Sequence, residues 1–189
     1  MSITSVKSGA TGISLALDNN FMEPIATTLV GSGGANTIIF NDIPQTYKHL
    51  QLRTIVRSQG AGGDYNAIVN FNSDATVGNY PLHYLFGNGT SVVSGYSAND
   101  TGIAIARSTG AGSTASMYGV GIADILDYTN TSKYKTVRIL LGSERNDPGI
   151  ILFNSGLWLN TNAINSMTIT VGGGNLAQYS RVSLYGIKG

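Results

Sequence analysis

Apolar and polar residues alternate with a period of two along most of this chain, and helical periodicity is nearly absent. A period of two places successive side chains on opposite faces of an extended segment, as in a strand with one buried face. The chain is therefore predicted to fold mainly as β-strands. The alternation is clearest in four segments, at residues 50–57, 136–141, 167–171 and 181–187.

Further strands are predicted where β-branched and aromatic residues are enriched. Together with the first four they give about ten strands at most. Only residues 80–86 suggest a helical turn, because Pro81 could occupy its first position. The additional predicted strands are residues 24–30, 37–40, 67–72, 102–107, 118–125 and 150–159.

Glycine-dense connectors separate these segments. Glycine and asparagine tolerate the positive φ angles that tight turns require, so each cluster predicts a chain reversal. A parallel sheet needs crossover connections of a dozen or more residues, and these connectors are too short. The predicted fold class is all-β, an antiparallel β-sandwich with a jelly-roll-like arrangement. The clusters lie at residues 31–34, 60–63, 87–89, 110–112 and 172–175.

The composition excludes several classes of protein. Of 189 residues, 42% are apolar and only 11% are charged, which argues against a disordered chain or a charged coiled coil. The net charge of +1 offers no long-range attraction for a polyanion, so no nucleic-acid partner is expected. The absence of cysteine excludes disulfides, thiol catalysis and cysteine-ligated zinc. No apolar stretch approaches the roughly 20 residues of a membrane-spanning helix, so no membrane partner is expected.

The beginning of the chain differs from the rest. Residues 1–22 space single apolar side chains through Ser, Thr and Gly, and are predicted to form an N-terminal arm ahead of a β-sandwich domain at residues 23–189. An arm of this kind can add a strand to a neighbouring sheet. A mobile terminus is the alternative interpretation. The interface candidates in the arm are Ile3, Val6, Ile13, Leu15 and Leu17.

No catalytic, cofactor-binding or metal-binding site is predicted. The two histidines, His49 and His83, lie far apart in sequence, and a zinc site would have to recruit carboxylates. Glu144 and Asp147 are the nearest pair of acids, but they lie in a polar segment typical of a turn, with Arg145 between them. The glycines at residues 31–34 precede a predicted strand, whereas phosphate binding would need a helix N-terminus.

Ten tyrosines accompany a single tryptophan. Exposed aromatic side chains stack on sugar rings and anchor protein interfaces, although tyrosines also pack across strands with their hydroxyl groups in water. Four tyrosines are candidates for recognition of a glycan or a protein partner: Tyr80, Tyr84, Tyr96 and Tyr118.

Particular segments of the chain are similar to a known group of proteins. At the C-terminal end these are residues 155–158 (SGLW), 161–169 (TNAINSMTI), 177–180 (AQYS) and 184–189 (LYGIKG). Residues 25–28 (IATT), 30–34 (VGSGG) and 40–50 (FNDIPQTYKHL) extend the similarity. Together they resemble a module of structural proteins from tailed bacteriophages, notably marine and cyanobacterial phages.

The resemblance implies a non-enzymatic virion component, built as a β-sandwich and often trimeric, with no catalytic residue to transfer. Its partners would be other virion proteins, either the major capsid protein or tail components, and its location the virion, assembled in the host cytoplasm. A single domain with a short arm favours a capsid decoration or cement protein. The alternative is a tail-fibre or baseplate-associated module that binds a host surface glycan. Association through sheet faces would bury the outward apolar residues Ile55, Leu140 and Ile187.

Overall fold

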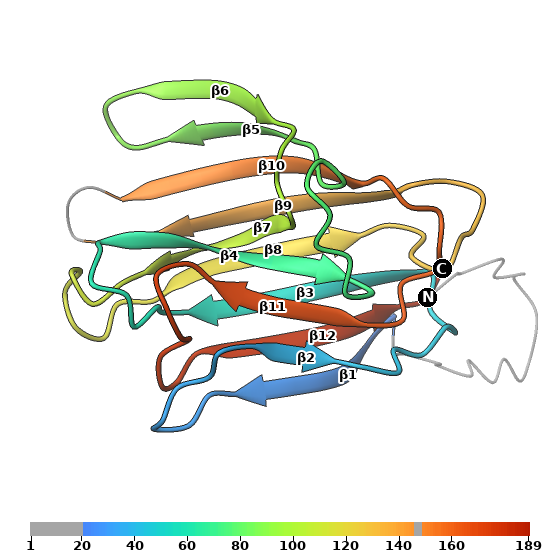
Figure 1. The fold of residues 1–189 in the computed structure, drawn as a ribbon, viewed down its shortest axis with the longest axis horizontal. Helices are drawn as coiled ribbons and strands as arrows, with labels where there is room; N and C mark the ends of the chain where they lie inside the picture. Colours follow the sequence, from blue (N-terminus) through green and yellow to red (C-terminus); the bar gives the residue numbers. More distant parts are fainter. Residues whose placement is uncertain (1–20, 146–148) are drawn as a thin grey trace, which may run out of the picture.

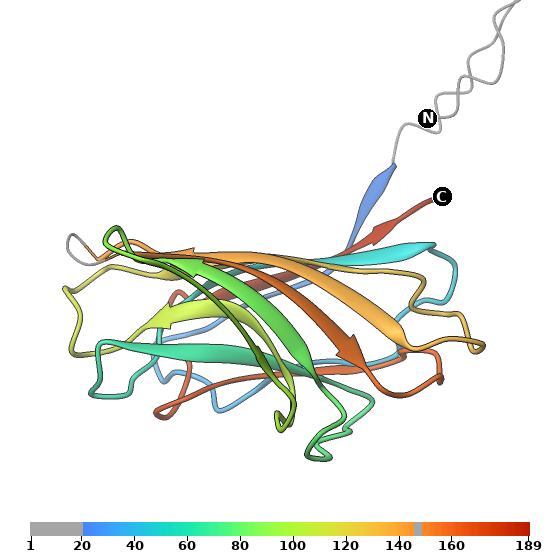
Figure 2. The ribbon, with the colours of Figure 1, turned by 90° about the horizontal axis from the view of Figure 1, so that it is seen from above.

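The computed structural model describes residues 21–145 and 149–189. In these residues twelve strands form two antiparallel sheets that pack face to face, and no α-helix is present (Figure 1). Figure 2 shows the two layers from the side. The all-β sandwich predicted from the alternation is confirmed. The jelly-roll arrangement stays a prediction.

The two sheets differ in width. The larger has eight strands in the order β1-β12-β3-β8-β9-β10-β5-β6, and the smaller has four in the order β2-β11-β4-β7. The strands of the larger sheet are β1 (Met22–Leu29), β3 (His49–Val56), β5 (Leu82–Gly87), β6 (Val92–Ser97), β8 (Gly119–Ile125), β9 (Lys135–Ser143), β10 (Ile150–Trp158) and β12 (Arg181–Ile187). Those of the smaller sheet are β2 (Ile38–Phe40), β4 (Asp64–Phe71), β7 (Ile103–Thr109) and β11 (Met167–Val171).

The ten predicted strands are all present, and the limits of β11 and β12 agree with those predicted. The predicted maximum of about ten was too low, because β5 and β6 were not predicted as strands. The helical turn predicted at residues 80–86 is wrong. Residues 82–87 instead form β5, which pairs with β10 on one side and β6 on the other. The error arose because β5 carries large apolar or aromatic side chains on both of its faces, so the segment has no period of two.

The core lies between the sheets and is formed by inward-facing residues of both. In β3 the inward positions are Leu50, Leu52, Thr54 and Val56, all buried, as the alternation predicts. The smaller sheet contributes buried side chains from each of its strands, including Phe40, Val69, Ile105 and Ile169. Trp158, Tyr80, Tyr128 and Phe71 are the largest fully buried aromatic side chains.

Two glycines in β8 set the distance between the layers. A Cβ atom on Gly121 would lie 1.8 Å from the carbonyl oxygen of Ile105 in β7, and a Cβ on Gly119 would lie 1.4 Å from that of Arg107. Both contacts are with backbone, which cannot rotate away. The strand β7 therefore lies directly on β8 only because these inward positions carry no side chain.

We expect G121V to destabilise the fold by about 2–3 kcal/mol or more, because the added side chain forces the two sheets apart. The measurement is urea unfolding followed by tryptophan fluorescence. The matched control is G31A, at a position where a Cβ meets no atom within 4 Å, and its free energy of unfolding should change by less than about 0.5 kcal/mol. Equal stability of the two variants would show that the layers are not in contact at β7 and β8.

A buried tryptophan and an aspartate hold the connection between β4 and β5 against the larger sheet. The indole Nε1 of Trp158 donates a hydrogen bond of 2.8 Å to Oδ2 of Asp74. The backbone N–H of Thr76 and the side-chain amide of Asn79 also donate to this carboxylate, both at 2.9 Å. Partial burial raises the pKa of Asp74, but the hydrogen bonds from Trp158, Thr76 and Asn79 outweigh it and lower the pKa to about 2.

The lowered pKa of Asp74 predicts a loss of stability in acid. A carboxyl whose pKa is lower in the folded state stabilises the fold above its unfolded pKa of 3.8, and this contribution disappears as the pH falls toward 2. The free energy of unfolding should therefore decrease between about pH 4 and pH 2, by an amount on the order of 1 kcal/mol from this group. In D74N, which cannot titrate at this position, the decrease should be smaller. An unchanged pH dependence in D74N would contradict the assignment.

Candidate functional site

The outer face of the larger sheet, which points away from the smaller sheet, carries an unusual set of exposed side chains. Seven large apolar residues on five adjacent strands are between 38% and 59% exposed. Isolated exposed apolar residues are common on protein surfaces, whereas contiguous groups mark interaction sites. We call this group the apolar face, and its members are Ile55, Leu85, Val120, Ile122, Leu140, Ile151 and Phe153.

The strand register makes these residues neighbours. Ile122 lies opposite Leu140, Leu140 opposite Phe153, and Phe153 opposite Leu85, which gives one apolar row across four strands. In a second row Ile55 lies opposite Val120. Gly142 separates Val120 from Ile151 in that row. Because residues two apart along a strand share a face, the two rows lie side by side.

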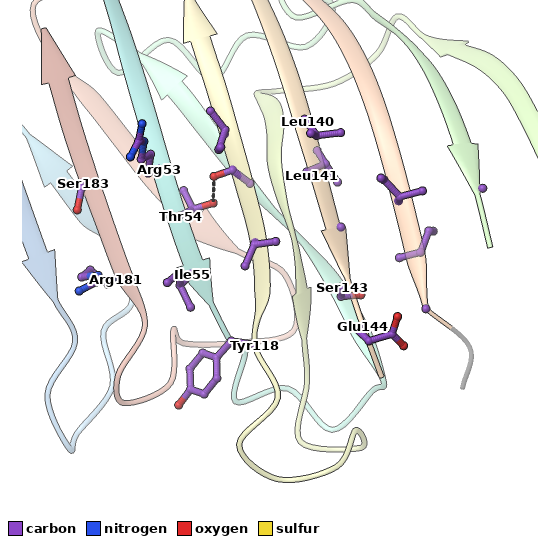
Figure 3. Close-up of a pocket in the computed structure, with 18 of the residues that line it drawn as sticks. Arg53, Thr54, Ile55, Tyr118, Leu140, Leu141, Ser143, Glu144, Arg181 and Ser183 are labelled. Carbon is purple, nitrogen blue, oxygen red and sulfur yellow. Dashed lines mark hydrogen bonds between the residues drawn. The ribbon is translucent and has the colours of Figure 1, made fainter. Parts of the chain in front are cut away.

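The second row lies in a groove with a volume of about 1060 Å³ (Figure 3). Its floor includes Ile55, Val120, Leu140 and Ile151. Figure 3 shows Tyr118 before the start of β8 and Glu144 after the end of β9, at the same end of the groove. The Tyr118 hydroxyl donates a 2.7 Å hydrogen bond to the carbonyl of Gln178, which fixes the ring in this position.

A polar row borders the apolar face on one side. Arg53 donates to Gln51 at 2.9 Å, and Gln51 donates to Asp124 at 2.7 Å. The Arg53 guanidinium also lies 5.3 Å from the centre of the Tyr185 ring. An apolar centre with a polar border is the arrangement typical of protein interfaces.

The outer face of the smaller sheet is different in composition. Its exposed large apolar residue is Ile39 in β2, which is 52% exposed, and Thr168 of β11 lies opposite it. Asn70 of β4 lies opposite Thr168 on the other side. Large exposed apolar side chains therefore gather on the larger sheet, and Ile39 offers a matched position for control experiments.

The interface residues predicted from sequence lie in different environments in the structure. Ile55 and Leu140 belong to the apolar face. Ile187 lies on the outward side of β12 by register, opposite Met22 and His49 on the two neighbouring strands, but its predicted exposure is wrong because the residue is buried. The candidates Ile3, Val6, Ile13, Leu15 and Leu17 lie outside the described residues, as does most of the predicted arm. Met22 is the first residue of β1.

The four candidate tyrosines do not form one recognition surface. The proposal that Tyr80 is exposed for recognition is wrong, because it is fully buried and its hydroxyl accepts from Phe71 N–H and donates to the Asp74 carbonyl. Burial raises the pKa of this phenol well above its usual value. Tyr84 packs over Gly95 on the inner face of the sheet. Tyr96 is exposed on β6, and Tyr118 lines the groove.

Sequence reasoning missed five of the seven residues of the apolar face. In β8 the reason is specific. Val120 and Ile122 alternate with Gly119, Gly121 and Ala123, and the rule that large apolar side chains point inward would bury the valine and the isoleucine. The structure places the small residues inward instead, because β7 lies directly on them.

The two histidines lie at separate places, and of the acids considered from sequence Asp147 lies outside the described residues. His49 Nδ1 accepts a 2.9 Å hydrogen bond from Asp127 N–H, and the His83 ring lies 5.8 Å from that of Tyr96. Asp127 is paired with Lys133 and Lys48, and hydrogen bonds from these two lysines lower its pKa to about 2. Within residues 21–145 and 149–189, no three His, Asp or Glu side chains are grouped to hold a metal ion.

No protein-family model matches this chain, and no curated protein matches its sequence. In the described part of the chain, no helix is long and apolar enough to cross a membrane.

Adjacent leucines of β9 test the assignment of the two faces. Leu141 is 2% exposed in the core, so L141A should lower the free energy of unfolding by about 2–4 kcal/mol. Leu140 is about half exposed on the apolar face, and L140A should lower it by no more than about 1 kcal/mol. Urea unfolding of both variants measures the difference. A larger cost for L140A would mean that the face is already covered within one copy of the chain.

Proposed function

We propose that this chain is a non-enzymatic structural protein on the exterior of a bacteriophage particle, most simply a capsid decoration or cement protein. The observation that carries the proposal is the apolar face, which would dock on a neighbouring virion protein such as the major capsid protein. The similarity of residues 25–50 and 155–189 to phage structural modules supports the same function. A jelly-roll arrangement and association as a trimer are further parts of this proposal that come from the resemblance alone.

Physical chemistry favours a protein surface as the partner of the apolar face. Each of its seven side chains leaves a substantial part of its area in water, and covering that area is favourable by about 25 cal/mol per Å². The residues are mostly β-branched or aromatic and lie on strands hydrogen-bonded on both sides, so little conformational entropy remains to be lost on docking. The polar row of Arg53, Gln51 and Asp124 would form the rim of such an interface.

A tail-fibre or baseplate-associated receptor-binding module is the second candidate function. The observation that favours it is the groove, whose volume of about 1060 Å³ could hold part of a glycan chain. Tyr118 and Tyr185 line the groove, and aromatic side chains stack on sugar rings. In this function the chain would bind a host surface polysaccharide through the groove instead of a capsid through the whole face.

A rebinding experiment tests the docking function. The purified protein is added to virions of the encoding phage from which this protein has been removed, by mild denaturant or by deletion of its gene, and binding is measured by co-sedimentation. L140D places a charge at the centre of the apolar face and should weaken binding at least about tenfold. The control I39D places the same charge at an equally exposed position on the smaller sheet, and should bind as the unmodified protein does.

Imaging separates the candidates. Immunogold labelling of intact virions should place the protein over the capsid if it is a decoration protein, and at the tail if it is a receptor-binding module. Labelling at neither place would overturn the proposal that it belongs to the particle. Equal loss of binding in L140D and I39D would show that the apolar face is not the docking surface.

A further inference from the structure

The strand β6 forms one edge of the larger sheet, and its outer side has no partner. It pairs with β5 from Val92 to Ser97, and no strand lies beyond it (Figure 1). Among the described residues, no hydrogen bond reaches β6 from its outer side. The strand thus presents a row of main-chain donors and acceptors that another strand could use.

The hydrogen-bond pattern identifies which residues of β6 face outward. In the turn before β6, Asn88 N–H donates to the Ser91 carbonyl, which marks residues 88 and 91 as a hydrogen-bonded pair. Such pairs alternate along an antiparallel ladder, so Val93 and Gly95 bond to β5. The hydrogen bond from Leu157 N–H of β10 to the Pro81 carbonyl leads to the same assignment. Alternate residues of β5, starting from Pro81, bond to β10, so the residues between them bond to β6. The backbone groups of Val92, Ser94 and Tyr96 therefore point away from the sheet.

The other three sheet edges carry features that prevent pairing. Edge strands of soluble proteins are commonly protected by proline, charge, bulges, short length or a covering segment. In β1 the edge contains Pro24 and a bulge beside it, and Glu23 is paired with Lys188 at 2.7 Å. The edge strand β2 has only three residues.

The fourth edge, β7, is protected as well. It has a bulge in its pairing with β4, and Arg107 in it forms a 3.0 Å ion pair with Asp64. Its backbone also packs against β8 of the other sheet, which is possible because Gly119 and Gly121 have no side chains there. Of the four edges in the described residues, β6 alone has none of these features.

The side chains of β6 also resemble those of an interior strand, which has a neighbouring strand on each side. Val92–Ser97 contains no charged residue and no proline, and its pairing with β5 has no bulge. Val92 is 74% exposed and Tyr96 is 70% exposed on the outer face of the sheet, while Val93 is exposed on the inner face. Uncharged edges rich in β-branched and aromatic residues associate with other strands when nothing blocks them.

We propose that β6 pairs with β6 of a second copy of this chain, antiparallel, about a two-fold axis at Ser94. A two-fold axis perpendicular to the sheet keeps the outer faces of both copies on the same side, so a residue on the axis lies opposite itself. With Ser94 at that position, Val92 lies opposite Tyr96 of the second copy. Every outward N–H and C=O of Val92, Ser94 and Tyr96 then has a partner in the other copy.

The side chains fit this register. On the outer face, valine lies opposite tyrosine on both sides of the axis, and β-branched and aromatic residues form favourable cross-strand pairs. On the inner face, Val93 lies opposite Gly95, beside the Tyr84 ring that already covers this glycine. Two identical strands without charge have no repulsion to overcome, which favours a second copy over a partner selected by charge.

This pairing stands independently of the docking function, and it gives a two-fold dimer in place of the trimer that the resemblance implies. It also has a consequence for docking. The two larger sheets would form one continuous sheet, and the apolar faces of both copies would lie on the same side. A dimer could then dock on a neighbouring surface through two faces at once, and linked binding sites raise overall affinity.

Single-cysteine variants test the pairing, and the natural absence of cysteine makes them unambiguous. In S94C the two thiols would lie across the axis, with Cα atoms about 5.5 Å apart, within the range that a disulfide bridges. In V92C the two thiols would lie about 13 Å apart, four residues out of register. The control is L29C, an exposed position on the protected edge strand β1.

We expect the unmodified protein to sediment as a dimer at micromolar concentration. Under mild oxidation S94C should form a disulfide-linked dimer at least about tenfold faster than V92C or L29C. The variant S94P removes an outward N–H, and should sediment as a monomer while its far-UV circular dichroism remains that of the folded protein.

Other results would overturn the pairing. A monomer at these concentrations, or a dimer or trimer in which S94C is not oxidised faster than L29C, would exclude it. A further measurement mixes the S94C and L15C variants. If S94C forms a disulfide with L15C faster than with itself, residues 1–20 of another copy occupy the edge instead.

Discussion

The difference in width between the two sheets is the constraint on which the rest of this structure depends. Each strand has two faces, and a sheet of four strands cannot cover a sheet of eight. The smaller sheet lies close to the larger one at β7, because Gly119 and Gly121 have no side chains and leave room for the β7 backbone. Beyond β7, the strands β5 and β6 extend without a covering strand (Figure 1). The hairpin therefore has two accessible faces and one open edge.

The same constraint accounts for the apolar face. Where β7 and β8 touch, only glycine fits on the inner side, so the large side chains of β8 are on the outer side. The neighbouring strands β9, β10 and β5 place Leu140, Phe153 and Leu85 beside them by register. A surface of this kind favours a protein that functions through contact with other proteins. The docking function and the β6 pairing use different parts of it, the face and the edge, and can be tested separately.

Much of the fold could be predicted because strand formation is a local property. The alternation in β3, β11 and β12 and the glycine-rich turns were sufficient to identify the sandwich. The hairpin of β5 and β6 could not be identified, because residues such as Tyr84, Leu85 and Phe86 are large and apolar on both faces and show no period of two. For the site, Ile55 and Leu140 were predicted correctly as outward and exposed. Ile187 is buried despite its outward position in β12, and Tyr80 is buried beside Trp158 and Phe71.

The sequence by itself determined the extended backbone, the positions of the turns and the scarcity of charge, because these depend on residues close together in the chain. Only the tertiary structure decided which side of each strand faces the core. In β8 it reversed the direction that side-chain size suggests, since a strand more than ten residues earlier occupies the space beside Gly119 and Gly121. The tertiary structure also decided that β6 is an edge strand. Strand order follows from packing between distant segments, and no local pattern in Val92–Ser97 predicts an edge position.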